Sequence, residues 1–225
     1  MNPAYRFTAF LIRVYLRATC RLHAPDMHKI PMKGPLIVIT NHTGRIEVPV
    51  LFALLQPRKI TAWAKLETWD NWLLGRVFTL WGIIPIRRGE ADMNALRKAI
   101  EALDNEFIFG IAPEGTRNKT GRLLRAHPGA VLLAIRSGVP ILPVAHWGGE
   151  AHLRNLKGLR RTDFHLRVGD PFRLKVGEVK MGHVIRQQIA DEMMYRVAEL
   201  LPQEYRGAYE KAPENMGAFT KSISL

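Results

Sequence analysis

The chain has 225 residues, of which 47% are hydrophobic, enough apolar material for the buried core of a single domain. Its 33 basic and 20 acidic residues give a net charge of +13, which favours anionic partners such as phospholipid surfaces, phosphorylated small molecules, acidic carrier proteins or nucleic acid. The single cysteine, Cys20, excludes an intrachain disulfide framework and a thiolate metal cluster.

The N-terminal segment, residues 1–24, predicts an amphipathic helix. Arginines recur at intervals of seven, four and four residues and gather on one narrow helical stripe: Arg6, Arg13, Arg17 and Arg21. Apolar side chains, Leu16 among them, fill the rest of the helical wheel. A basic stripe beside a broad apolar face is typical of a helix that lies in the headgroup layer of a membrane. The alternative is an ordinary helix that packs on the core and leaves a charged edge in solvent.

No apolar run reaches the ~18 residues of a confident bilayer-spanning helix. The arginines within the N-terminal apolar stretch, which lacks a cleavage site, also argue against a signal peptide. We therefore expect that any contact with a membrane is made from one side.

Short apolar runs and helical patterns alternate along the rest of the chain. Buried strands are predicted at residues 35–40, 60–64, 82–86, 107–111, 139–145 and 164–168. Helices are predicted from Pro49 onward and over residues 67–80, 91–105, 128–136 and 179–200. This alternation indicates an α/β fold, a layered and largely parallel sheet with flanking helices. In such folds the chemistry usually lies in loops at the carboxyl ends of the strands.

The first predicted strand ends directly in a segment that contains His42 and Glu47. A neutral imidazole can take a proton from an attacking hydroxyl, and a carboxylate on its other nitrogen fixes the tautomer. Five residues subtend about 140° on an α-helix, so the two side chains meet only across a turn, which Gly44 permits. Taken alone, the spacing is a weak signal and favours a surface histidine followed by an unrelated glutamate at a helix start.

Three further blocks follow this one. After the strand at 107–111 comes Pro-Glu-Gly-Thr-Arg at residues 113–117, where glycine permits a tight turn and arginine offers a planar fork for phosphate. Residues 82–89 read Gly-Ile-Ile-Pro-Ile-Arg-Arg-Gly, a strand that delivers two arginines. Residues 139–144 read Val-Pro-Ile-Leu-Pro-Val, an apolar strand without reactive groups.

Together and in this order, the four blocks resemble the glycerolipid acyltransferase family, the lysophosphatidate acyltransferases, across residues 35–172. That family's blocks read Asn-His-x-x-x-x-Asp, Gly-x-Ile-Pro-Val-x-Arg-Gly, Pro-Glu-Gly-Thr-Arg and Val-Pro-Ile-x-Pro-Val. The resemblance implies that His42 is the general base and that Glu47 replaces the family's aspartate with an arm one methylene longer. It also implies a set of acceptor-binding residues: Lys65, Arg88, Glu114, Gly115, Thr116 and Arg117, with Arg87 as a neighbour.

The resemblance implies a reaction that needs no acyl-enzyme, cofactor or metal. His42 takes the proton of the acceptor hydroxyl, which attacks the thioester carbonyl of acyl-CoA or an acyl carrier protein. A lysophosphatidic-acid-like acceptor is expected, because both positions for phosphate-binding arginines are filled, by Arg88 and Arg117. The product is then phosphatidic acid for phospholipid biosynthesis, made at the cytoplasmic face of the cell membrane by a peripheral or monotopic enzyme.

Residues 1–24 are thus expected to dock on an anionic membrane, residues 25–210 to form the acyltransferase domain, and residues 211–225 to be a flexible tail. Three alternatives remain open: another lysolipid as acceptor, glycerol 3-phosphate as acceptor, and a non-catalytic lipid-binding relative whose Glu47 does not support His42. The basic residues are spread out, with no helix-turn-helix, zinc-finger or RNA-binding aromatic pattern, so we expect no nucleic-acid partner.

Other conspicuous side chains carry weaker signals. Seven histidines lack zinc-ligand spacing and are expected to be structural or solvated: His23, His28, His127, His146, His152, His165 and His183. Four tryptophans are either core residues or an interfacial belt: Trp63, Trp69, Trp72 and Trp81. Four basic residues form a solvated face or a contact for anionic lipid or an acidic carrier protein: Arg154, Lys157, Arg160 and Arg161.

Overall fold

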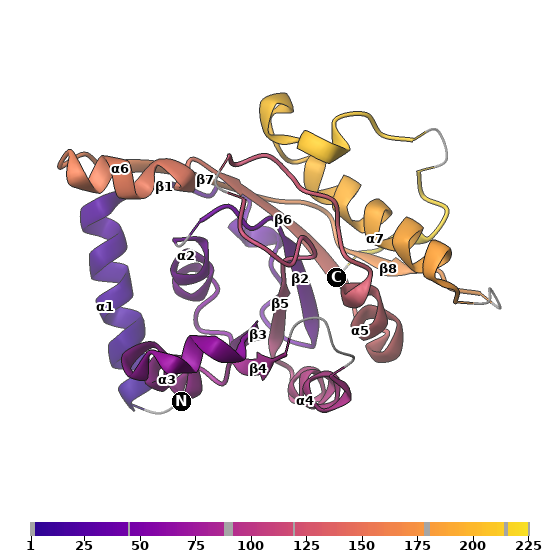
Figure 1. The fold of residues 1–225 in the computed structure, drawn as a ribbon, viewed down its shortest axis with the longest axis horizontal. Coiled ribbons are helices and arrows are strands. Elements are labelled where there is room, and N and C mark those ends of the chain that lie inside the picture. Colours follow the sequence, from indigo (N-terminus) through magenta and orange to yellow (C-terminus); the bar gives the residue numbers. More distant parts are fainter. Residues whose placement is uncertain are drawn as a thin grey trace.

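The computed structural model describes residues 3–44, 46–87, 92–118, 120–177, 181–213 and 216–224. Its centre is one sheet whose strands run in the order β1-β7-β6-β2-β5-β3-β4, with β8 beside β6 and β9 beside β8 (Figure 1). The strands, in chain order, are β1 (Cys20–His23), β2 (Leu36–Thr40), β3 (Ile60–Lys65), β4 (Ile84–Ile86), β5 (Ile108–Ile111), β6 (Ile141–Trp147), β7 (Thr162–Val168), β8 (Phe172–Leu174) and β9 (Thr220–Ser222).

The central strands run parallel. β2 pairs in parallel with β5 and with β6, and the parallel ladder continues from β5 through β3 to β4. β7 and β8 run antiparallel to β6. Every residue of β2 is buried, as expected for a strand covered on both faces. Its side chains alternate between two buried clusters, with Ile37 and Ile39 in one, Leu36 and Val38 in the other.

Helices cover both faces of the sheet. They are α1 (Pro3–Thr19), α2 (Glu47–Leu54), α3 (Trp72–Leu80), α4 (Met93–Asp104), α5 (Gly129–Ser137), α6 (His152–Lys157) and α7 (His183–Ala198). The α4, α5 and α7 helices pack in the cluster that contains Ile37, whereas α1 and α2 pack in the cluster that contains Leu36. The chain is therefore a layered α/β fold with a central sheet flanked by helices, as the sequence predicts (Figure 1).

Side-chain caps explain where two of the helices begin. The helix predicted over residues 67–80 is divided into a 3₁₀ helix, η2 (Leu66–Asp70), and α3, because Asn71 Oδ1 accepts the backbone N–H of Leu74 at 3.0 Å. The α4 helix begins at Met93 because Asp92 Oδ1 accepts the backbone N–H of Ala95 at 2.9 Å. The predicted starts of α4 and α7, at residues 91 and 179, lie outside the described residues.

The chain termini differ from the sequence expectation in two respects. The α1 helix ends at Thr19, and Cys20–His23 forms β1, which pairs in parallel with β7. The predicted docking segment, residues 1–24, is therefore joined to the sheet. Its Leu16 lies in the core rather than on an outer apolar face. The expected flexible tail contains β9 at Thr220–Ser222, which pairs with β8 and corrects that expectation for these residues. Among the described residues, no helix is both long and apolar enough to cross a membrane.

Candidate active site

The His42 imidazole and the Glu47 carboxylate meet across the turn between β2 and α2. His42 Nδ1 lies 2.7 Å from Glu47 Oε1, and the backbone N–H of Gly44 donates to the same oxygen at 3.3 Å. A carboxylate only accepts hydrogen bonds, so Nδ1 carries the proton and Nε2 keeps its lone pair. The longer arm of Glu47 therefore reaches the histidine, and the pair has the geometry of a general base with its orienting group.

Glu47 is almost completely buried, with 2% of its side chain exposed, against 16% for His42. Burial is the largest influence on the pKa of Glu47 and raises it. The hydrogen bond from His42, together with attraction to His146 and His42, outweighs burial and holds the pKa below its ordinary value. Glu47 is the first residue of α2, where the helix dipole also favours a negative charge. The carboxylate is thus ionised at neutral pH and can stabilise an imidazolium on His42.

The carboxylate of Glu114 holds the backbone of this loop rather than lying open to solvent. Its Oε1 accepts the backbone N–H of His42 at 2.8 Å, and its Oε2 accepts the backbone N–H of Leu124 at 2.8 Å. Glu114 is 1% exposed, and this burial raises its pKa to about 7 despite the two hydrogen bonds. Glu114 therefore positions His42 by bracing the main chain from which the imidazole projects.

Gly115 occupies a position that only glycine adopts without strain. Its φ is +65°, and a Cβ added there would lie 2.9 Å from Cδ2 of His127. The backbone N–H of His127 in turn donates to the carbonyl of Pro113 at 2.8 Å, which closes the loop on itself. His127 thus belongs to the site, although its sequence context, His-Pro-Gly, reads only as a turn that opens a helix.

A cavity of about 560 Å³ opens beside His42. Much of its wall is apolar and comes from β3, β4, β5 and the helices α4 and α5: Trp63, Ile86, Leu96, Ile111, Ala130 and Leu132. Lys65 and Arg87, both exposed at strand ends, add positive charge to the lining, and Gly115 and His127 complete it near His42. A pocket that combines an apolar wall with cations suits an amphipathic substrate that carries a negative group.

Two of the other predicted acceptor residues, Thr116 and Arg117, are not among the residues that line this cavity. Thr116 and Arg117 are exposed on the loop after Gly115. The backbone N–H of Asn118 donates to the carbonyl of His42 at 2.8 Å, so Arg117 is adjacent in sequence to a residue bonded to the histidine. Arg88 lies outside the described residues. The phosphate-binding roles of Arg88 and Arg117 stay predictions.

A buried pair, Asn41 and His146, fixes the end of β2 against β6. The Asn41 side chain donates to the His146 carbonyl at 2.7 Å and accepts the His146 backbone N–H at 3.0 Å. The His146 ring contacts the Asn41 carbonyl through Nε2 at 2.8 Å, and burial lowers the pKa of this histidine. His146 is thus structural, one of the two outcomes expected for it, but the sequence gives no sign that it supports the residue before His42.

The four tryptophans differ in burial, and the interfacial role stays a prediction. Trp81 is buried, and Trp63 is half-buried, with its Nε1 donating to the Ala95 carbonyl at 3.2 Å. Trp69 is also half-buried and donates to Thr79 at 3.0 Å. Trp72 is 71% exposed at the start of α3. Three of the rings therefore pack within the fold, and one faces outward.

Comparison with known proteins identifies relatives of this chain. The family model described as Acyltransferase matches residues 21–147. The 1-acyl-sn-glycerol-3-phosphate acyltransferase of Bacillus subtilis (strain 168) is 26% identical over 167 residues, 74% of this chain and 81% of that protein. The chloroplastic 1-acyl-sn-glycerol-3-phosphate acyltransferase BAT2 of Brassica napus is 27% identical over 116 residues, 51% of this chain but only 33% of that longer protein.

A solved structure shares the fold. The crystal structure of the 1-acyl-sn-glycerophosphate acyltransferase PlsC from Thermotoga maritima superimposes with a TM-score of 0.57 at 23% sequence identity, covering 88% of this chain and 82% of that one. The matched family region includes β2, the His42–Glu47 turn and the Glu114 loop. The chain belongs to the acyltransferase family.

Proposed function

We propose that this protein transfers an acyl chain from an acyl thioester to the free hydroxyl of a lysophosphatidic-acid-like acceptor, which yields phosphatidic acid. The observation that carries the proposal is the 2.7 Å contact between His42 and buried Glu47 beside a cavity with an apolar wall and cationic lining residues. Two of the relatives described above are named 1-acyl-sn-glycerol-3-phosphate acyltransferases, which supports the same acceptor here.

On the family resemblance, we propose direct transfer without an acyl-enzyme. Nε2 of His42 takes the proton of the acceptor hydroxyl as its oxygen attacks the thioester carbonyl. The resulting tetrahedral intermediate collapses, the carbon–sulfur bond breaks, and the imidazolium returns its proton to the leaving thiolate. Glu47 stabilises the imidazolium in between, because its carboxylate is buried, ionised and bonded to Nδ1.

The two parts of the cavity suit the two parts of such substrates. The apolar wall, with Trp63, Ile111 and Leu132, suits an acyl chain, because burying each methylene contributes about 0.8 kcal/mol. Lys65 and Arg87 suit a phosphate, because charge-assisted hydrogen bonds to phosphate are roughly twice as strong as neutral ones. We assign Arg88 and Arg117 to the acceptor phosphate as well, on the family resemblance.

We further propose that the enzyme works as a peripheral or monotopic protein on an anionic membrane, at the cytoplasmic face of the cell membrane. The support is the α1 outer face, which we define as the exposed apolar residues of α1 with the arginines around them: Phe7, Phe10, Leu11 and Val14 with Arg6, Arg13 and Arg17. The opposite side of the helix buries Tyr5, Ala9 and Leu16, so α1 is anchored to the core while its outer face has no cover within the described chain.

The experiment is an acyl-transfer assay with the purified full chain in detergent. Lysophosphatidic acid, a second lysolipid and glycerol 3-phosphate are each offered with acyl-CoA and with acyl carrier protein, and the lipid products are identified by mass spectrometry. We expect phosphatidic acid from lysophosphatidic acid with at least one donor. If folded protein prefers another acceptor, the acceptor assignment is wrong, and if no pair reacts, the enzymatic proposal itself fails.

A further inference from the structure

The short α6 helix and the turn after it carry exposed leucines at intervals of three residues. Leu153, Leu156 and Leu159 are 53%, 38% and 96% exposed. Basic residues alternate with them and are also exposed: Arg154, Lys157 and Arg160. We call residues 152–161 the α6 corner. A single exposed leucine is ordinary, but three of them interleaved with cations form a mixed apolar and basic surface.

Leu159 occupies a backbone position that glycine usually fills. The backbone N–H of Leu159 donates to the Leu156 carbonyl at 3.1 Å, and that of Arg160 donates to the Asn155 carbonyl at 2.8 Å, the two bonds of a Schellman helix end. In this motif the residue in the position of Leu159 adopts a left-handed conformation, and its φ is indeed +52°. Glycine usually fills that position, yet here Gly158 precedes it with an ordinary φ of −87°.

Two features of Leu159 therefore lower the stability of the folded chain. Its backbone is strained, and its apolar side chain lies almost wholly in water. Neither improves the packing of the folded chain, since the side chain is 96% exposed. Strain that the fold does not need is a sign of function, and transfer of this leucine into an apolar medium would recover part of the cost.

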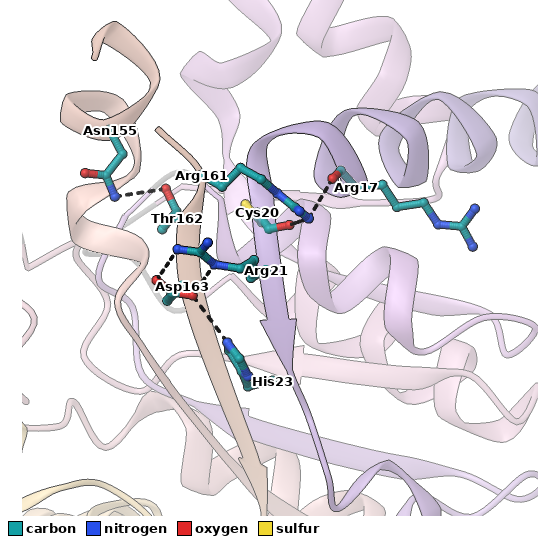
Figure 2. A network of polar contacts seen from close by, with 8 residues as sticks. All are labelled: Arg17, Cys20, Arg21, His23, Asn155, Arg161, Thr162 and Asp163. Atoms are coloured by element: carbon teal, nitrogen blue, oxygen red, sulfur yellow. Dashed lines mark hydrogen bonds and ion pairs between the residues drawn. The ribbon is translucent and has the colours of Figure 1, made fainter. Parts of the chain in front are cut away.

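Hydrogen bonds fix the α6 corner to the end of α1. Figure 2 shows the Arg161 guanidinium reaching the carbonyls of Arg17 and Cys20, the former at 2.9 Å. The Tyr15 hydroxyl contacts Nε2 of His152 at 2.8 Å. In Figure 1, α6 lies across one end of α1 at the edge of the molecule. The α6 corner is thus joined by hydrogen bonds to the C-terminal end of the helix that carries the α1 outer face.

We propose that the α6 corner is a second contact with an anionic phospholipid bilayer, in which the leucines enter the headgroup layer and Arg154, Lys157 and Arg160 bind lipid phosphates. This inference rests on the membrane docking proposed for α1. The composition favours a lipid surface, since residues 151–162 include no acidic side chain. None of the ion pairs found in the described part of the chain involves the three cations.

The first test labels Leu159→Cys with an environment-sensitive dye in the full chain; Cys20 is 1% exposed and stays unlabelled. Val184→Cys is the matched control, because Val184 is 67% exposed on α7, which lies on the other side of the molecule from α6 (Figure 1). Vesicles of phosphatidylcholine mixed with phosphatidylglycerol should shift the emission of the dye at residue 159 to the blue and leave the dye at residue 184 unchanged. No shift at residue 159 while the protein is vesicle-bound would overturn the proposal.

The second test measures vesicle binding of Leu159→Gly and of Phe10→Ser, a change on the α1 outer face. Leu159→Gly relieves the backbone strain, so the thermal midpoint should rise slightly while binding weakens about tenfold for loss of an inserted leucine. If Phe10→Ser weakens binding and Leu159→Gly does not, the α6 corner fails and α1 docking stands. If the wild type binds no anionic vesicles, both fail. A dye response to an acidic acyl carrier protein, with none to vesicles, would replace lipid by a protein partner.

Discussion

Glu114 and His42 are 72 residues apart in sequence, yet Oε1 of Glu114 accepts the backbone N–H of His42 at 2.8 Å. The other carboxylate oxygen accepts the backbone N–H of Leu124, so one buried side chain ties the histidine loop to the loop after β5. This bond explains why a glutamate is needed at a position that does not face the cavity. The two backbone donors bond to different oxygens of Glu114, and a carboxylate provides an acceptor at both positions.

Glu114→Gln should therefore lower turnover through the position of His42. An amide has one acceptor oxygen, so one of the two backbone N–H groups loses its partner, at a cost of about 1–3 kcal/mol. We expect kcat to fall while the KM values for donor and acceptor change little. Steady-state kinetics with each substrate varied in turn checks this, and a rise in acceptor KM at unchanged kcat would mean that Glu114 contacts substrate instead.

The same substitution has a pH signature in stability. Because the pKa of Glu114 is raised to about 7, the folded protein keeps a proton that the unfolded chain releases near its ordinary pKa. The free energy of unfolding of the wild type should thus fall as the pH rises from the ordinary pKa of glutamate to about 7. Glu114→Gln has no carboxyl group at this position and lacks the effect. The free energy of unfolding of the wild type minus that of Glu114→Gln should decrease by roughly 3 kcal/mol from about pH 4 to about pH 8. A difference independent of pH contradicts the raised pKa.

Variants of Glu47 test whether the carboxylate orients His42. Glu47→Ala removes the acceptor of the Nδ1 hydrogen bond and the counter-charge of the imidazolium, so turnover should drop by about 10²-fold or more. Glu47→Asp keeps the charge but shortens an arm that reaches its partner at 2.7 Å, so its activity should lie between those of the wild type and Glu47→Ala. The test is turnover of all three proteins at saturating substrate. Wild-type turnover in Glu47→Ala would remove this residue from the mechanism.

Gly115→Ala should destabilise the loop, because alanine at a φ of +65° costs about 1 kcal/mol or more and its Cβ meets the ring of His127. Gly129→Ala is the matched control, since a Cβ there meets nothing within 4 Å and Gly129 begins α5. Denaturant unfolding of the two variants measures the difference. Equal free energies of unfolding would show that the loop rearranges without cost.

The phosphate-binding proposal predicts that Lys65→Ala and Arg117→Ala raise the KM of the acceptor much more than that of the donor. Loss of one charge-assisted hydrogen bond corresponds to roughly tenfold or more in KM. Arg122→Ala is a suitable control, because Arg122 is an exposed arginine farther along the same loop. If only the donor KM rises, these cations bind the acyl carrier instead of the acceptor phosphate.

Local sequence patterns are sufficient to predict the central sheet, whereas the pairing of His42 with Glu47 follows only from the family resemblance of the four blocks. The strands β2, β5 and β6 are continuous apolar runs, and a parallel sheet brings the ends of β2 and β5 to one edge, which joins the two motif loops. The three-residue strands β8 and β9 are too short to show a periodic pattern, so the C-terminal pairing was missed.

The role of Glu114 was beyond prediction, because its partners, His42 and Leu124, are defined only once the loops are folded. The division of α1 into a buried and an exposed apolar side could not be predicted for a related reason. A helical wheel shows one broad apolar face, whereas the structure buries Leu16 and exposes Phe7 and Phe10. Periodicity cannot separate an apolar side that packs on the core from one that stays outside.

The most direct measurement of the central claim is the turnover of His42→Ala, compared with His183→Ala, a change of an exposed histidine on α7. Thermal unfolding of both variants establishes that each is folded, and acyl transfer to lysophosphatidic acid is then measured at saturating substrate. We predict that His42→Ala loses about 10²–10⁴-fold in turnover, because this variant lacks the imidazole that takes the proton from the acceptor hydroxyl, while His183→Ala keeps wild-type turnover. Near-normal turnover in folded His42→Ala would contradict the account.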